Sequence, residues 1–97
     1  MNDIYRRIMT TAAEQCGLTF EQVVTRQSRG PAKHDITTAR FIGWYILHTH
    51  FGWSHSQICR HAVLFSRPTV RYGINRISEM PHTSTIGEHV ERILASV

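Results

Sequence analysis

The sequence predicts an all-α fold, a compact bundle of about six helices that contains a helix-turn-helix. Every strongly patterned segment repeats its apolar residues with a helical period, and no segment alternates apolar and polar residues as a half-buried strand does. With 97 residues, 41% of them hydrophobic, the chain suits one small domain over residues 1–97 with a modest core, and it is too short for a large multi-domain enzyme.

The first expected helix occupies the N-terminal segment. Asn2 or Asp3 can cap it, because a short polar side chain there accepts a hydrogen bond from a free backbone N–H. Gly17 stops it, since glycine readily adopts the left-handed conformation found after helices. The residues expected to face the core lie on one helical face, at Ile4, Ile8, Ala12 and Cys16.

A short helix and a basic loop follow. Residues 19–22, Thr-Phe-Glu-Gln, have the pattern of a capping box, in which the first and fourth side chains each satisfy the other residue's backbone N–H. They predict a helix through about Thr25. From Arg26 to His34 the chain is polar and basic and contains Gly30-Pro31, which breaks helices, so we expect a loop.

The third expected helix, capped by Asp35, is the centre of the core. It is apolar around most of its circumference, which is typical of a helix surrounded by others, and it ends at Phe51-Gly52. Trp44 is expected in the core, whereas Trp53 fits either a core position or an exposed contact. The apolar residues of the helix are Phe41, Ile42, Trp44, Tyr45, Ile46 and Leu47.

The next segment predicts the helix-turn-helix. Residues 54–57, Ser-His-Ser-Gln, form a second capping box, which begins a short helix that buries Ile58 and Ala62. Residues 63–65 form the turn. Ser66 then caps a basic, hydroxyl-rich helix, the one that would enter a major groove of DNA.

This second helix of the motif has Pro68 in its first turn, where the missing N–H of proline costs nothing, and it ends at Met80-Pro81. A third capping box at residues 85–88 predicts a final helix. The two helices are expected to bury Val70, Ile74 and Ile77 in the first and Val90, Ile93 and Leu94 in the second.

Positive charge is concentrated in the middle of the chain. The net charge is +4, but residues 1–21 hold two arginines against three acidic residues, and residues 79–97 hold one arginine against three. Between residues 22 and 78, eight basic residues stand against Asp35 alone. Most of them are arginines, whose planar guanidinium matches phosphate oxygens and the guanine edge, so we expect double-stranded DNA as the partner.

Three segments together resemble one known family. Residues 17–21 read Gly-Leu-Thr-Phe-Glu, residues 39–46 read Ala-Arg-Phe-Ile-Gly-Trp-Tyr-Ile, and residues 58–77 cover the helix-turn-helix. They are similar to the lead-in, the core helix "AR.IA.YL" and the last motif of the C-terminal DNA-binding domain of the bacterial replication initiator DnaA, a Trp-repressor-like helix-turn-helix. The resemblance covers about residues 17–79. The last motif matches without a gap and keeps its residue types at Ile58, Arg60, Thr69, Val70, Arg76 and Ile77.

The resemblance implies which residues contact DNA. Arg40 and the loop residues Arg26, Arg29 and Lys33 would hold the minor groove and the phosphates. Arg60 and Arg76 are further basic residues that we assign to the DNA interface. The residues that would face the major groove are Ser66, Arg67, Pro68, Thr69 and Arg71.

The chain departs from the family pattern where bases are read. It has Ser-Arg-Pro-Thr at 66–69 in place of Asp-His-Ser-Thr, and Val-Leu-Phe at 63–65 in place of a glycine pair and a basic residue. We therefore expect a DNA site different from the initiator's own. Arg67 could read guanine with two hydrogen bonds, Pro68 could contact a thymine methyl, and Thr69 could bind a phosphate or a base edge.

The sequence argues against an enzyme, a metal site and a cofactor. It contains no G-x-x-x-x-G-K-[ST] phosphate loop, so we expect DNA binding without ATPase activity. His55 and Cys59 have a spacing that suits two metal ligands, but no H-E-x-x-H motif is present and no acidic residue lies between 35 and 79. The histidines that could supply a third ligand are His48 and His50.

The remaining expectations concern location and protein partners. No apolar run reaches the roughly 18 residues of a membrane span, and the N-terminus lacks the apolar region of a secretory signal, so we expect a cytoplasmic protein without a membrane partner. Cys16 and Cys59 are expected to be free thiols. The alternative to DNA binding is a protein-interaction module, which docks on a partner or forms a homodimer through its terminal helices. Its candidate contacts are Arg6, Arg7, Glu88 and Glu91.

Overall fold

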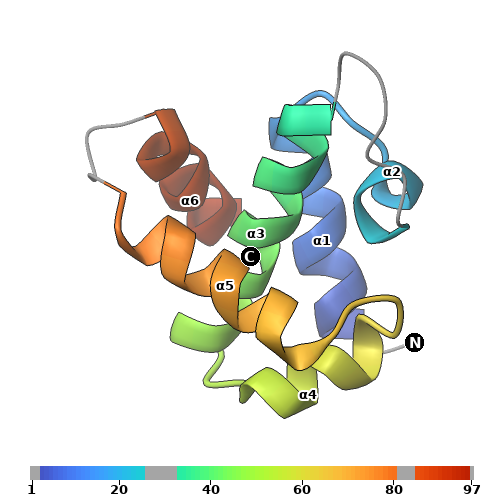
Figure 1. Ribbon diagram of the computed structural model, residues 1–97. Helices are drawn as coiled ribbons and strands as arrows, with labels where there is room; N and C mark the ends of the chain where they lie inside the picture. The colour runs from blue at the N-terminus through green and yellow to red at the C-terminus, as the bar shows by residue number, and fades with distance from the viewer. Residues whose placement is uncertain (1–2, 26–32, 81–84, 97) are drawn as a thin grey trace.

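The computed structural model describes residues 3–25, 33–80 and 85–96 (Figure 1). Within these ranges the chain forms helices and no strand, so the predicted all-α bundle is confirmed. None of the described helices is long and apolar enough to cross a membrane. The helices are α1 (Asp3–Gln15), α2 (Phe20–Val24), α3 (Lys33–Thr49), α4 (His55–His61), α5 (Arg67–Ser78) and α6 (Thr85–Ser96).

Helix α3 is the centre of the core, as the sequence predicts. It packs against the five other helices, most extensively against α5 and α1, and α5 crosses in front of it in Figure 1. Trp44 is fully buried, and Trp53 is only 7% exposed, so both tryptophans belong to the core. The other fully buried apolar residues of α3 include Ile42, Ile46 and Leu47.

The buried face of α1 matches the predicted one in part, since Ile8 and Ala12 are buried. Ile4 is 41% exposed, and Cys16 lies beyond the end of the helix. The structure instead buries Tyr5, whose ring stacks on His61 with centroids 5.4 Å apart. The members of the buried face are Tyr5, Ile8, Met9, Ala12 and Ala13.

Two helix starts also differ from the prediction. Helix α3 begins at Lys33, so Asp35 lies in its first turn, where a carboxylate still stabilises the positive end of the helix dipole. Thr85 is the first residue of α6, so it is not the N-cap that the capping-box pattern predicts. The capping boxes of α2 and α4 are confirmed, because Thr19 and Ser54 each exchange hydrogen bonds with the residue three positions later.

Phe65 holds the turn between α4 and α5 against the core. Its backbone N–H donates to the carbonyl of Ala62 at 3.0 Å, and its ring packs edge-on against Trp44 with centroids 5.3 Å apart. Helix α5 then approaches α3 so closely that a Cβ at Gly73 would overlap the ring of Phe41. These contacts determine where the exposed face of α5 lies.

Candidate nucleic-acid interface

Arg40, which the resemblance assigns to DNA, is buried inside the protein. Only 5% of the residue is exposed. Its Nε donates to the carbonyl of Val23 at 2.8 Å, and its Nη2 donates to the carbonyl of Thr25 at 2.7 Å. These carbonyls lie at the C-terminal end of α2, where helices leave such groups without an internal partner. Arg40 therefore holds the end of α2 against α3.

The same guanidinium also supports the turn of the helix-turn-helix. Its carbon lies 4.3 Å from the centroid of the Phe65 ring, a cation–π contact. Burial lowers the pKa of Arg40, opposed by its interaction with Tyr5, but an arginine begins so high that it stays charged. This corrects the assignment of Arg40 to the DNA interface, because its side chain is buried and two of its donors bind backbone carbonyls.

The other basic residues assigned to DNA fall into two groups. Arg26 and Arg29 lie outside the described residues, as does the side chain of Lys33, so the predicted loop contacts stay a prediction. Arg60 on α4 and Arg76 on α5 are exposed, as a phosphate contact requires.

A groove lies between the start of α4 and the exposed face of α5. We call it the α4–α5 groove. The chain from residue 54 to residue 78 contains four arginines and no acidic residue, and none of the side chains that line the groove is acidic. The residues that line it are Ser54, His55, Ser56, Arg67, Pro68, Arg71, Tyr72 and Asn75.

The geometry of α5 divides the predicted DNA contacts into different faces. At about 100° per residue, Pro68, Arg71, Tyr72 and Asn75 share one outward face, opposite the buried stripe. Thr69 and Arg76 lie on one flank of this face, and Arg67 lies on the other flank, beside α4. The buried stripe consists of Val70, Gly73, Ile74 and Ile77.

Polar side chains at the start of α5 form two separate sets of hydrogen bonds. The Ser66 hydroxyl accepts the backbone N–H of Thr69 at 3.4 Å and lies 2.9 Å from the Thr69 hydroxyl, so these two residues serve the predicted helix cap. Arg67 reaches across the turn instead, where its Nη1 donates to the Ser56 hydroxyl at 2.7 Å. The guanidinium of Arg67 is thereby held at the edge of the groove.

His55 lies close to the positive charges of the groove. Its ring stacks on that of His48 with centroids 4.6 Å apart, and His48 Nδ1 lies 2.8 Å from the carbonyl of Trp53. The pKa of His55 is lowered by partial burial and by the positive charges of His48, Arg71 and Arg67.

The sequence did not predict two groove residues on α5, nor Ser56 on α4. Tyr72 is 58% exposed, and its ring meets Phe41 edge-on with centroids 5.9 Å apart. Asn75 follows Arg71 by four residues and is also exposed. A helical projection of residues 67–78 would have found both, because they lie opposite the apolar stripe. No local signal could have found Ser56, which joins the groove only through the packing of α4 on α5.

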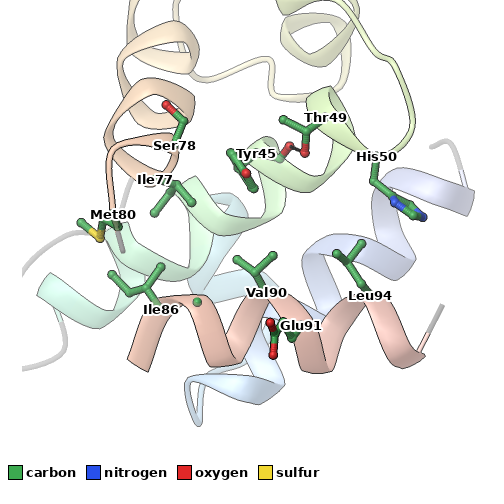
Figure 2. Close-up of a pocket in the computed structure, with 11 residues that line it drawn as sticks. Tyr45, Thr49, His50, Ile77, Ser78, Met80, Ile86, Val90, Glu91 and Leu94 are labelled. Carbon is green, nitrogen blue, oxygen red and sulfur yellow. Dashed lines mark hydrogen bonds between the residues drawn. The ribbon is translucent and has the colours of Figure 1, made fainter. Parts of the chain in front are cut away.

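A second hollow lies between α3, α5 and α6 (Figure 2). Ile77, Ile86 and Val90 point into it. The hydroxyls of Thr49 and Ser78 donate to carbonyls of their own helices, at 2.8 Å each, and so do not converge on it. We assign no ligand to this hollow.

Within the described ranges, no group of three or more histidine, cysteine or acidic residues could hold a metal ion. Cys16 and Cys59 are free thiols.

Comparison of the chain with known protein families, with curated proteins and with solved structures found no match. The resemblance to the initiator domain therefore depends on the motifs quoted above, and the argument for function depends on the geometry of the α4–α5 groove.

Proposed function

We propose that this protein binds double-stranded DNA in a sequence-specific manner by placing α5 in the major groove. It acts as a helix-turn-helix module of the initiator type, in the control of replication or transcription and without ATPase activity. The observation that supports this most is the α4–α5 groove, which presents Arg67, Arg71 and Asn75 together and has no acidic side chain in its lining. A single helix fits the major groove of B-form DNA.

Each side chain of the groove is assigned a different contact with DNA. Arg67 can donate two hydrogen bonds to guanine, and Asn75 can pair with the edge of adenine through its amide. Arg71 lies on the same outward face and serves either a base or a phosphate. Pro68 has no donor and makes apolar contact, for instance with a thymine methyl.

The flanking arginines supply affinity without reading sequence. Arg60 on α4 and Arg76 on α5 are exposed and can bind phosphates. Since each phosphate contact releases counterions, binding should weaken steeply as salt concentration rises.

The proposal is tested by selecting binders from a random-sequence duplex library at two salt concentrations. We expect an enriched motif and an affinity that falls steeply with salt. Absence of binding at low salt would contradict DNA binding. It would favour the alternative, in which a protein partner or a second copy docks on the exposed charges of α1 and α6, among them Arg6, Arg7, Glu88 and Glu91.

Single substitutions then separate base reading from phosphate binding. Arg67→Ala or Asn75→Ala should relax the preference at one base pair, at a cost of about 1–3 kcal/mol on the preferred duplex. Arg60→Ala or Arg76→Ala should weaken all duplexes alike and reduce the salt slope by about 1. Arg92→Ala on α6, an exposed arginine outside the groove, is the matched control and should change neither. Equal loss on every sequence for Arg67→Ala would refute its role in base reading.

A further inference from the structure

We propose that Ser56 is a positioning residue, which orients Arg67 for base reading and thereby sets specificity without touching DNA itself. This inference rests on the proposed function and adds to it a residue outside the recognition helix.

The contact that carries the inference joins the two helices of the motif. Ser56 is the second residue of α4, and Arg67 is the first residue of α5. The 2.7 Å hydrogen bond from Arg67 Nη1 to Ser56 Oγ therefore spans the turn. Arg67 is exposed, so packing does not hold its long side chain in place. The serine hydroxyl supplies the constraint that packing does not.

The geometry of the bond also leaves the reading edge of Arg67 free. A guanidinium has five N–H donors, and Ser56 takes one of those on Nη1. The edge formed by Nε and Nη2 can still donate two parallel hydrogen bonds to guanine. Ser56 thus fixes the orientation of the fork without consuming the pair of donors that reads the base.

The size of the expected effect follows from the cost of ordering a side chain. Immobilising one flexible side chain at an interface weakens binding by about 2- to 10-fold, and in the wild type this cost is already met before DNA arrives. Removing the Ser56 hydroxyl should therefore lower affinity for the preferred duplex by about 2- to 10-fold. Affinity for a duplex that lacks the guanine should stay unchanged, because Arg67 makes no base contact there.

The experiment compares Ser56→Ala, Ser56→Thr and the wild type on two duplexes, the selected one and one in which the base pair read by Arg67 is replaced. We expect Ser56→Ala to lower the ratio of the two affinities and Ser56→Thr, which keeps a hydroxyl, to restore it. Ser96→Ala, in which the lost hydroxyl bonds only to Arg92 of its own helix, is the matched control and should leave the ratio unchanged.

A double-mutant cycle decides whether Ser56 acts through Arg67. In the Arg67→Ala background, Ser56→Ala should have no further effect on the ratio. The same loss in both backgrounds, or equal weakening on both duplexes, would overturn the positioning role while leaving DNA binding intact. A wild type that selects no duplex would instead refute the proposed function and, with it, any positioning for base reading. Because alanine is favourable inside a helix, Ser56→Ala is expected to keep α4 folded, which far-ultraviolet circular dichroism would verify.

Discussion

Two arginines to which the resemblance gives a role in DNA binding lie in very different surroundings. Arg40 lies at the junction of α2 with α3, and Arg67 lies at the α4–α5 groove. Arg40 is 5% exposed and donates to two backbone carbonyls. Arg67 is exposed and donates to one side-chain hydroxyl at the rim of a groove. The first guanidinium is buried and bonded to the protein's own backbone, whereas the second is exposed and can reach a partner.

The contrast shows that positive charge in the sequence does not by itself locate a DNA interface. Both arginines contribute equally to the net charge, yet burial and hydrogen-bond partners assign them to different tasks. The two arginines are linked by Phe65, because Arg40 lies over the ring of this residue in the turn that leads to Arg67. We therefore expect that loss of Arg40 affects DNA binding through the fold of this turn and not through a lost contact with DNA.

Replacing the buried arginine should have the largest effect. Arg40→Ala removes the donors to Val23 and Thr25, and their carbonyls are left without partners at the end of α2. We expect a loss of about 2–4 kcal/mol in the free energy of unfolding, measured by urea denaturation. Arg67→Ala, the exposed counterpart, should change stability by no more than about 0.5 kcal/mol. If the two variants were equally stable, the contrast between the arginines would fail.

Replacing Gly73, which lies on the buried face of α5, should have the second largest effect on stability. In Gly73→Ala the added Cβ would overlap the ring of Phe41, and this ring also contacts Tyr72 on the exposed face. We expect a net loss of about 1–2 kcal/mol in the free energy of unfolding, since overpacking outweighs the helix propensity gained.

Gly43→Ala on α3 is a matched control for this prediction. There the added Cβ would meet the sulfur end of Met9, which is flexible and can move aside, whereas an aromatic ring cannot. Thermal unfolding should rank Gly43→Ala above Gly73→Ala in stability. The reverse order would show that α5 does not depend on its close approach to Phe41.

The smallest expected effect is a dependence of stability and DNA affinity on pH, through His55 in the α4–α5 groove. Because the folded protein lowers the pKa of His55, the unfolded chain binds a proton more readily, and stability should decrease as pH falls through about 6.5. A nearby DNA phosphate would favour the protonated ring, so affinity for DNA should rise over the same interval, by less than about tenfold.

Titration of DNA affinity between pH 5.5 and 8 would test this pH dependence. His55→Gln should flatten the increase at low pH, whereas His50→Gln, at an exposed residue just beyond α3, should retain it. An unchanged profile in His55→Gln would place the titrating group elsewhere.

Local patterns in the sequence predicted much of the fold correctly. The capping boxes at Thr19 and Ser54, the cap at Ser66 and the apolar circumference of α3 all depend on residues within a few positions of one another. The face of α1 was predicted only in part: Ile8 and Ala12 are buried as expected, but Tyr5, which stacks on His61, is buried where Ile4 was expected.

The sequence by itself determined the helical class, the position of the helix-turn-helix and the concentration of arginine around it, since composition, periodicity and capping are properties of nearby residues. Only the tertiary structure decided which arginines face solvent. Burial of Arg40 depends on carbonyls 17 and 15 residues earlier in the chain, and the orientation of Arg67 depends on a hydroxyl 11 residues earlier. Contacts over such separations follow from how the helices pack, which is why no local pattern reveals them.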